Sequence, residues 1–271
     1  QLGIISMVKS GSTEGIYNVY LSIDRSGMSF DVFAKEYEDY LRMRVFGAES
    51  IVDYYSKRVL PIIHKNIEGK IGVATAFILF DGIVTAKHCI ENAKEISIKS
   101  FTKEQLTSAE FLTHTNENLD ILCIRINDFQ DEGHSYVNEP TELEEVISFG
   151  FPKIPGFTHF MTKEKAIVSS LPSSRISKSS GTIVAIAEEI FAREALFLIT
   201  AKIRGGNSGG PIINLSGEVV GISTEAPLVT DKDYDDLGYG VAVPIKFIQE
   251  ILDGKCSRID CNNITFQNFE E

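Results

Sequence analysis

From residue 71 onward, short apolar runs alternate with Gly, Asn, Pro and Asp-Gly turn signals, and this pattern constrains the fold class most strongly. Each run has the length of a β-strand and is bounded by residues that favour turns. Many short strands at this spacing predict barrels or a sandwich, and the strand–helix alternation that a parallel sheet requires is missing. The sequence therefore predicts an all-β fold built from these runs: Ile71–Phe80, Ile83–Ala86, Ile96–Ile98, Ile121–Ile126, Val146–Phe151, Ala166–Val168, Gly181–Ala187, Leu196–Ala201, Pro211–Ile213, Glu218–Ser223 and Gly240–Pro244.

The first 50 residues have a different texture. Residues 17–23 alternate as a short strand, and apolar side chains between Phe30 and Leu41 recur at helical spacing. A second helical pattern continues to Pro61 through Ile51, Val52, Tyr55, Val59 and Leu60. We interpret residues 1–50 as an N-terminal α/β extension that packs on the main body. A regulatory or partner-binding arm is the alternative.

The other end of the chain is simpler. Residues 245–252 form a final helical stretch that Gly254 ends, and residues 255–271 read as a polar C-terminal tail. Residues 51–254 are then the main domain. Within it, Ser169–Gly181 is rich in serine and lacks a large apolar cluster, which predicts a loop.

Composition excludes several classes of function. The chain carries 38 acidic and 26 basic residues, for a net charge of −12. Such a chain does not attract nucleic acid or an anionic membrane surface, and no apolar run approaches the ~18 residues that span a bilayer. The 4 cysteines are too few for a disulfide scaffold. They favour a reducing, cytoplasmic location, or a periplasmic or secreted one if a signal preceded Gln1. No zinc-ligand spacing is present, so no metal or cofactor is predicted.

The strongest local motif is Gly205-Gly206-Asn207-Ser208-Gly209-Gly210-Pro211. Glycines on both sides of a lone Ser allow a sharp turn that presents the hydroxyl and aims N–H groups at one point. A Ser hydroxyl is a weak nucleophile unless a base accepts its proton. The motif also fits the nucleophile elbow of α/β-hydrolases, but there the His follows the Ser. All 5 histidines precede Ser208 here, which excludes that fold.

Among these histidines, His88 has the best setting for a base, because it follows an apolar strand that holds a side chain rigidly while exposing it. His64 lies in the helical lead-in, and we interpret His114, His134 and His159 as surface residues. Asp120 is the natural third member. It lies at the mouth of an apolar strand, where a carboxylate needs a partner, and a His N–H would satisfy it and fix the ring tautomer.

Three motifs together resemble those of chymotrypsin-fold serine proteases: Thr85-Ala86-Lys87-His88-Cys89, Asp120-Ile121-Leu122-Cys123-Ile124-Arg125 and Gly206-Asn207-Ser208-Gly209-Gly210-Pro211. The match is closer to the bacterial high-temperature-requirement (HtrA/Deg) branch, through Asn207 and the segments 214–222 and 240–244. The resemblance implies two six-stranded antiparallel β-barrels, at about residues 70–150 and 160–250. It implies catalysis by His88, Asp120 and Ser208, with the N–H groups of Gly206 and Ser208 as the oxyanion hole.

The chain departs from the digestive relatives in two ways. Asn207 replaces the Asp that a new N-terminus pairs with during activation, and Ala74–Ala76 occupies the strand that would carry the disulfide partner of Cys89. The latter is therefore predicted to be a buried thiol. Activation must then order the oxyanion loop in another way, and Ser169–Gly181 and the segment before residue 51 are the candidates.

The resemblance also places a substrate pocket, which we assign to Lys202, Ile203, Ile222, Ser223, Gly240 and Ala242. Lys202 stands where trypsin-like specificity needs a carboxylate, so a cationic substrate side chain is disfavoured. Ile203 and Ala242 match the apolar pocket of the HtrA branch. We expect cleavage of protein or peptide substrates after small or medium aliphatic residues, with acidic residues as the second choice.

Two rival functions are compatible with parts of the sequence. One is a catalytically silent binding module on the same fold. The other is a calcium-binding loop at residues 231–235, which fails the EF-hand pattern because Asp236 stands where Gly is needed and Ala242 where the closing Glu should be.

Overall fold

The computed structural model describes residues 5–7, 19–21, 30–80, 82–127, 129, 136–152, 175–224 and 239–269, with side chains from residue 38 onward. The chain divides into two compact units, residues 1–39 and 40–271. In the first unit, β1 (Ile5–Met7) pairs antiparallel with β2 (Val19–Leu21). The long helix α1 (Phe30–Phe46) begins in the first unit and ends in the second.

The first of two sheets in the larger unit has the strand order β15-β7-β8-β5-β4-β3-β6-β16. Six of its strands come from one stretch of chain and pair antiparallel: β3 (Val59–Asn66), β4 (Ile71–Leu79), β5 (Gly82–Thr85), β6 (Ala93–Ile98), β7 (Glu110–His114) and β8 (Leu122–Arg125). Two short helices, α3 (His88–Glu91) and α4 (Lys103–Thr107), connect them. Its core is aliphatic, with Ile62, Ile83 and Leu122 fully buried.

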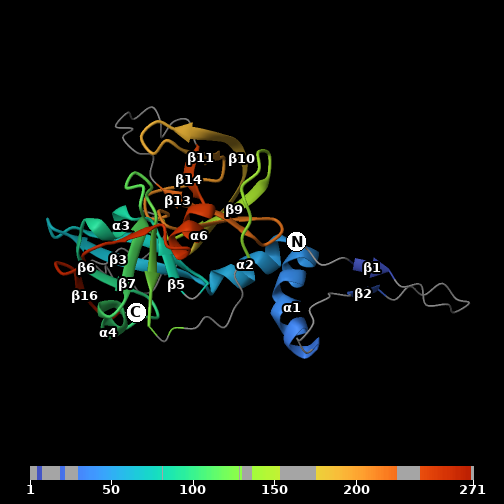
Figure 1. The fold of residues 1–271 in the computed structure, drawn as a ribbon, viewed down its shortest axis with the longest axis horizontal. Helices are drawn as coiled ribbons and strands as arrows, with labels where there is room; N and C mark the ends of the chain where they lie inside the picture. The colour runs from blue at the N-terminus through green and yellow to red at the C-terminus, as the bar shows by residue number, and fades with distance from the viewer. Residues whose placement is uncertain are drawn as a thin grey trace, which may run out of the picture. The chain divides into compact units, whose positions relative to one another are not determined.

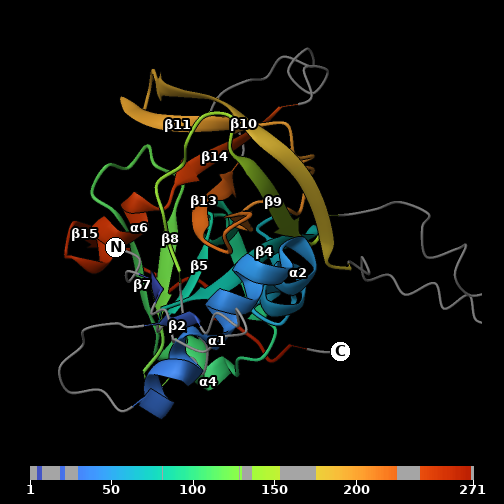
Figure 2. The same ribbon diagram turned by 90° about the vertical axis from the view of Figure 1, so that its right-hand side faces the viewer.

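The second sheet is a closed barrel in the order β10-β11-β14-β13-β12-β9. Its six strands are β9 (Glu145–Gly150), β10 (Ser177–Glu189), β11 (Glu194–Ile199), β12 (Pro211–Asn214), β13 (Val219–Thr224) and β14 (Gly240–Pro244). Phe197, Ile199 and Ile212 fill its interior. Figures 1 and 2 show this barrel and the first sheet as two distinct groups of strands. The predicted all-β fold with two barrels is thus confirmed, although the first sheet is not closed by hydrogen bonds between β6 and β7.

The residues predicted to be a polar tail contribute strands to the outer edges of the first sheet. After β14 the chain forms α6 (Lys246–Leu252), as predicted, and Gly254 ends it with a φ of 101°. Then β15 (Cys256–Arg258) pairs antiparallel with β7, and β16 (Thr265–Phe266) pairs parallel with β6. In sequence these residues are polar because an edge strand exposes much of its surface, so composition alone did not reveal the pairing.

Two local predictions were wrong. Val59 and Leu60 belong to β3 rather than to a helix, because β4 and β6 pair with this segment on both sides and this pairing overrides the local pattern. Ser177–Gly181 is the start of β10 rather than a loop, because it pairs with β9 from Ser177↔Gly150 onward. Residues 169–174 of the predicted loop lie outside the described residues, as do the predicted strand Ala166–Val168 and the acidic segment 231–235.

The end of α1 and the helix α2 (Ala48–Ser56) attach to the turn between β12 and β13 of the second barrel. The hydroxyl of Tyr40 donates to Glu218 Oε1 at 2.8 Å, and the buried hydroxyl of Tyr55 donates to the carbonyl of Gly217 at 2.8 Å. Directly after α2 the chain enters β3 of the first sheet. The boundary predicted at residue 50 therefore falls inside a helix that joins the two barrels.

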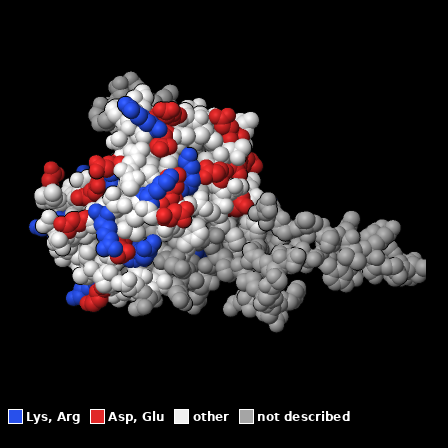
Figure 3. Space-filling view, in the orientation of Figure 1, with Lys and Arg blue, Asp and Glu red and all other residues white. Residues whose placement is uncertain are grey.

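The surface carries charge of both signs. On the face shown in Figure 3, acidic and basic side chains are interspersed. No helix in the described part of the chain is both long enough and apolar enough to cross a membrane.

Candidate active site

His88 occupies the first turn after the buried strand β5, at the start of α3. Ala86 and Cys89 on either side of it are buried, which fixes the backbone there. The backbone N–H of His88 donates to Asp120 Oδ1 at 2.9 Å, and the ring Nδ1 lies 2.6 Å from Asp120 Oδ2. These two contacts set both the position and the orientation of the imidazole.

Asp120 lies just before β8 and is held from both barrels. Leu119 and Ile121 on either side are buried in the first sheet. From the second barrel, the hydroxyl of Thr224 at the end of β13 donates to Asp120 Oδ2. The carboxylate therefore accepts three hydrogen bonds, which compensate for its partial burial.

The two groups change each other's ionisation. Burial raises the pKa of Asp120, but hydrogen bonds from His88 and Thr224 outweigh it and lower that pKa below its ordinary value. Burial also disfavours the charged form of His88, yet its hydrogen bond to the Asp120 carboxylate raises the pKa of the imidazole above its ordinary value. The pair therefore favours a carboxylate beside an imidazole that binds its proton tightly.

Ser208 sits in a tight turn at the entrance to β12. The N–H of Asn207 donates to the carbonyl of Arg204 at 2.9 Å, and the N–H of Gly210 donates to the carbonyl of Asn207 at 2.8 Å. Gly209, with a φ of 86°, touches the first sheet so closely that a Cβ there would lie 2.2 Å from the carbonyl oxygen of Thr75. Only glycine fits this conformation and this approach.

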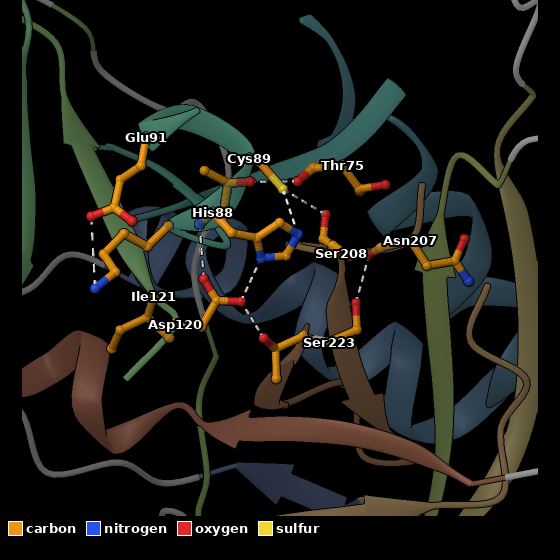
Figure 4. A network of polar contacts seen from close by, with 12 residues as sticks. Thr75, His88, Cys89, Glu91, Asp120, Ile121, Asn207, Ser208 and Ser223 are labelled. Atoms are coloured by element: carbon orange, nitrogen blue, oxygen red, sulfur yellow. Dashed lines mark hydrogen bonds and ion pairs between the residues drawn. The ribbon is translucent and has the colours of Figure 1, made fainter. Parts of the chain in front are cut away.

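Figure 4 shows the His88 ring between Asp120 and Ser208. Among the contacts of the described residues, no hydrogen bond joins the Ser208 hydroxyl to the ring, and His88 Nε2 lies 3.6 Å from Cys89 Sγ instead. In the unliganded state such hydrogen bonds are commonly long and tighten when substrate binds. The structure thus brings the three predicted residues together, but the Ser208 hydroxyl is not hydrogen-bonded to the His88 ring.

The proposed oxyanion donors lie in the same turn. Gly206 has a φ of 101°. The backbone N–H groups of Gly206 and Ser208 donate no hydrogen bond to another described residue. The side chain of Asn207 is buried against Gly150, and no described group hydrogen-bonds its Oδ1. An Asp at this place would bury a charge, a cost that the neutral amide of Asn207 avoids.

The predicted pocket residues are placed unequally. Ile222, Ser223 and Ala242 have an exposed fraction of 0%, and the Ser223 hydroxyl donates to the carbonyl of Asn207 at 2.6 Å. Ile203 lies over Gly240, where a Cβ would meet its Cδ1 at 2.4 Å. Lys202 is exposed. The structure thus supports an apolar wall at Ile203 and Gly240 and directs Lys202 to solvent.

Two other histidines occupy strands. His64 lies in β3 rather than in a helix, because that segment pairs on both sides. His114, predicted at the surface, is buried in β7, where its Nδ1 accepts the N–H of Asn116 at 3.0 Å and its Nε2 lies 3.0 Å from Glu250 Oε2. The carboxylate from α6 makes this burial tolerable. His134 and His159 lie outside the described residues.

Sequence reasoning missed two threonines at the site, Thr224 and Thr75. The first supports Asp120, and the hydroxyl of the second donates to the carbonyl of Gly206 at 2.7 Å. Both stand in apolar strands, where a β-branched Thr reads as an ordinary strand residue. No local signal distinguishes them.

Two barrels with these residues between them are the arrangement of trypsin-fold serine proteases. Comparison with known proteins supports this class, since the family described as "Trypsin-like peptidase domain" matches residues 74–222, more than half of the chain. The chain belongs to this family. The resemblance inferred from the three motifs is therefore confirmed.

Curated relatives come from the HtrA/Deg group. "Serine protease Do-like HtrB" of Bacillus subtilis is 27% identical over 63% of this chain, and "Serine endoprotease DegS" of Haemophilus influenzae is 27% identical over 63%. A "Probable periplasmic serine endoprotease DegP-like" of Pseudomonas savastanoi is 29% identical over 65%. The alignments span 34%, 45% and 34% of these relatives respectively, so the chain covers less than half of each.

Solved structures share the fold at low identity. The active form of the Rv3671c protease from M. tuberculosis superimposes with a TM-score of 0.54 at 16% identity, covering 78% of this chain and 85% of that one. The HtrA-type protease AlgW with tripeptide gives a TM-score of 0.51 at 18% identity, covering 75% and 61% respectively. These likenesses extend the two-barrel fold beyond the segment that the family matches.

Proposed function

We propose that this protein is a serine endopeptidase in which Ser208 attacks the carbonyl carbon of a peptide bond. The observation that carries the proposal is the His88–Asp120 pair of the first sheet, which faces the Ser208 turn of the second barrel (Figure 4). His88 Nε2 accepts the hydroxyl proton during attack and later gives it to the leaving amine. Water then hydrolyses the acyl-enzyme by the same base.

The tetrahedral oxyanion needs donors at the moment its charge develops. In our proposal the backbone N–H groups of Gly206 and Ser208 serve this role. Both lie in one turn with glycines on either side, and neither donates a hydrogen bond to another described residue. Such preorganised donors commonly provide one of the largest contributions to catalysis.

A catalytically silent binding module on the same fold is the second candidate, and the missing hydrogen bond between Ser208 and His88 favours it. Labelling with a fluorescent fluorophosphonate separates the two. A silent module stays unlabelled, whereas the peptidase forms a covalent adduct at Ser208 that the Ser208→Ala variant cannot form. Heat-denatured protein is the control for non-specific labelling.

The residue preferred before the scissile bond follows from the pocket. Ile203 packs over Gly240 and makes the pocket apolar and shallow. Lys202 is exposed, and because its ammonium group is solvated it repels a cationic substrate side chain only weakly. We expect small or medium aliphatic residues to be preferred, with acidic residues second, when the protein is profiled with a peptide library.

The variant Ile203→Ala should deepen the pocket. The ratio of kcat/KM for larger over smaller apolar residues should then rise by about tenfold or more, the usual effect of pocket volume. Lys202→Met is the matched control and should change only the use of acidic residues. Dominant cleavage after Lys or Arg would show that the pocket is misplaced.

We further propose that residues 1–50 or 169–181 gate the site by ordering the oxyanion loop, in response to a protein partner. The neutral Asn207, whose Oδ1 accepts no hydrogen bond from the described residues, supports this, because an amide cannot form the usual ion pair with a charged N-terminus. The substrates are proteins or peptides. A cytoplasmic location gains no support from the relatives, of which the DegP-like protein is named periplasmic.

Gating by the N-terminal segment is tested by a chain that begins at Tyr40, which retains the larger compact unit. We expect kcat for a short peptide to fall by about fivefold or more, the lower end of typical coupling between sites. KM and the melting temperature should stay close to those of the full chain. Equal kcat in the two chains contradicts gating by residues 1–39.

A further inference from the structure

Thr75 lies in the middle of β4 and is fully buried, with an exposed fraction of 0%. Its hydroxyl donates to the carbonyl of Gly206 at 2.7 Å and accepts the N–H of Phe151 at 2.9 Å. One side chain thus connects three parts of the molecule: the first sheet, the turn before Ser208, and the end of β9 in the second barrel. Figure 4 shows Thr75 beside Ser208 and Cys89.

The backbone of Thr75 fixes where this hydroxyl can point. Its N–H donates to the carbonyl of Ser208 at 3.0 Å, and the strand β4 pairs with β3 at this residue, with Thr75 opposite Pro61. A β-branched side chain has few rotamers in a strand. Because the hydroxyl oxygen already accepts the N–H of Phe151, its single proton is directed at the carbonyl of Gly206.

The Gly206 peptide needs such a restraint. Glycine rotates more freely about φ and ψ than any other residue, and Gly206 is held at a φ of 101°. Rotation about this residue would turn the two N–H groups of the turn relative to each other. The N–H of this peptide, which belongs to Asn207, is held within the turn by the carbonyl of Arg204, and the Thr75 hydroxyl restrains its carbonyl from the first sheet.

We propose that Thr75 is a positioning residue for the oxyanion hole, acting through the Gly206 carbonyl rather than by touching substrate. The inference rests on the proposed peptidase function of the same site. In this proposal a residue of the first sheet positions the oxyanion hole, although both of its N–H donors belong to the second barrel. The ordinary alternative is a buried Thr that contributes only to stability.

Thr85 provides a matched control for that alternative. It is also fully buried in a strand of the first sheet, and its hydroxyl makes one hydrogen bond, to the carbonyl of Thr75. That hydroxyl does not hydrogen-bond the Gly206 turn. Replacing either Thr by Val removes a buried hydroxyl from the same neighbourhood with little change of shape.

The experiment compares Thr75→Val, Thr75→Ser and Thr85→Val by peptide kinetics, melting temperature and inhibition by a peptide aldehyde, whose hemiacetal oxygen enters the oxyanion hole. For Thr75→Val we expect kcat to fall by about 10²-fold with KM nearly unchanged, since misplacing a reacting group by about 1 Å costs that much. Aldehyde affinity should fall by a similar factor. Thr75→Ser should restore most of both, and Thr85→Val should stay within about threefold of the wild type.

Equal losses in Thr75→Val and Thr85→Val, or an unchanged kcat in folded Thr75→Val, would overturn the inference. If Thr75→Val does not fold, Thr75→Cys replaces it, because a thiol is a weak donor of similar size and should give an intermediate kcat. A kcat for Thr75→Cys equal to that of Thr75→Ser would also count against the proposal. Wild-type protein that cleaves no peptide and forms no adduct with a fluorophosphonate would refute the peptidase function itself, which is a separate result.

Discussion

Replacing Ser208 by Ala is expected to lower kcat for peptide cleavage by on the order of 10⁶-fold, to the level left by the oxyanion hole and substrate binding. Without the hydroxyl no acyl-enzyme forms. The only nucleophile left is water, which the Ser208 turn does not position. His88→Ala should cost about as much, because the hydroxyl then has no base. The double variant should be no slower than either single one, since the two groups act as a unit.

The loss must be separated from unfolding. The Ser208 hydroxyl makes no hydrogen bond to another described residue, so its removal should leave the melting temperature unchanged within about 2 °C by the usual scaling for a domain of this size. Ser257→Ala is a matched control, because Ser257 is an exposed residue of β15, outside the site and the proposed gating segments. Substantial activity in Ser208→Ala at full purity would refute the assignment of the nucleophile.

The variant Asp120→Asn should lower kcat by about 10⁴-fold, the cost of the wrong tautomer in a triad of this type. Asp120 Oδ1 accepts the backbone N–H of His88, so an amide would keep its oxygen there and place its NH₂ against Nδ1. The ring would then carry its proton on Nε2, which faces Ser208. A ring in that state cannot accept the hydroxyl proton.

The same variant should also shift the pH profile. In the wild type, Asp120 raises the pKa of His88, so the neutral base and with it kcat/KM increase as the pH rises through that raised pKa. Removing the carboxylate lowers the pKa, because the hydrogen bond that most strongly opposes the effect of burial is then lost, and the acid limb should move to lower pH, towards the ordinary value of about 6.5. Asp53→Asn, which removes an exposed ion pair with Lys57, should leave the limb in place. An unmoved limb in Asp120→Asn would show that His88 is not the group that titrates.

Most strands of both barrels could be predicted because their apolar runs are short and separated by turn residues, but no predicted run corresponds to β7. The positions of His88, Asp120 and Ser208 could be inferred because nucleophilic catalysis restricts which residues combine and in what order. Val59 and Leu60 were assigned to a helix, since a short apolar run fits both periods and only pairing with β4 and β6 decides between them.

Contacts between residues far apart in the sequence could not be predicted. His114 looks like a surface residue until Glu250 of α6 is brought to within 3.0 Å of its ring. The serines of Ser177–Gly181 suggest a loop until β9 pairs with them. Thr75 and Thr224 acquire their roles from Gly206 and Asp120, which lie on the other barrel in each case. The sequence indicates which side chains are chemically capable of a role, but the residues that contact them are known only from the fold.

The short strands β15 and β16 bear on how the protein is made. They cover the outer edges of β7 and β6, strands that appear much earlier in the chain. During synthesis, residues 256–266 leave the ribosome after every strand of both barrels, so those edges remain unpaired for most of translation. Unpaired edges invite association with other chains, and pairings this distant in sequence form slowly. The nascent protein is therefore open to association through these edges from the synthesis of β6 and β7 until β15 and β16 pair with them.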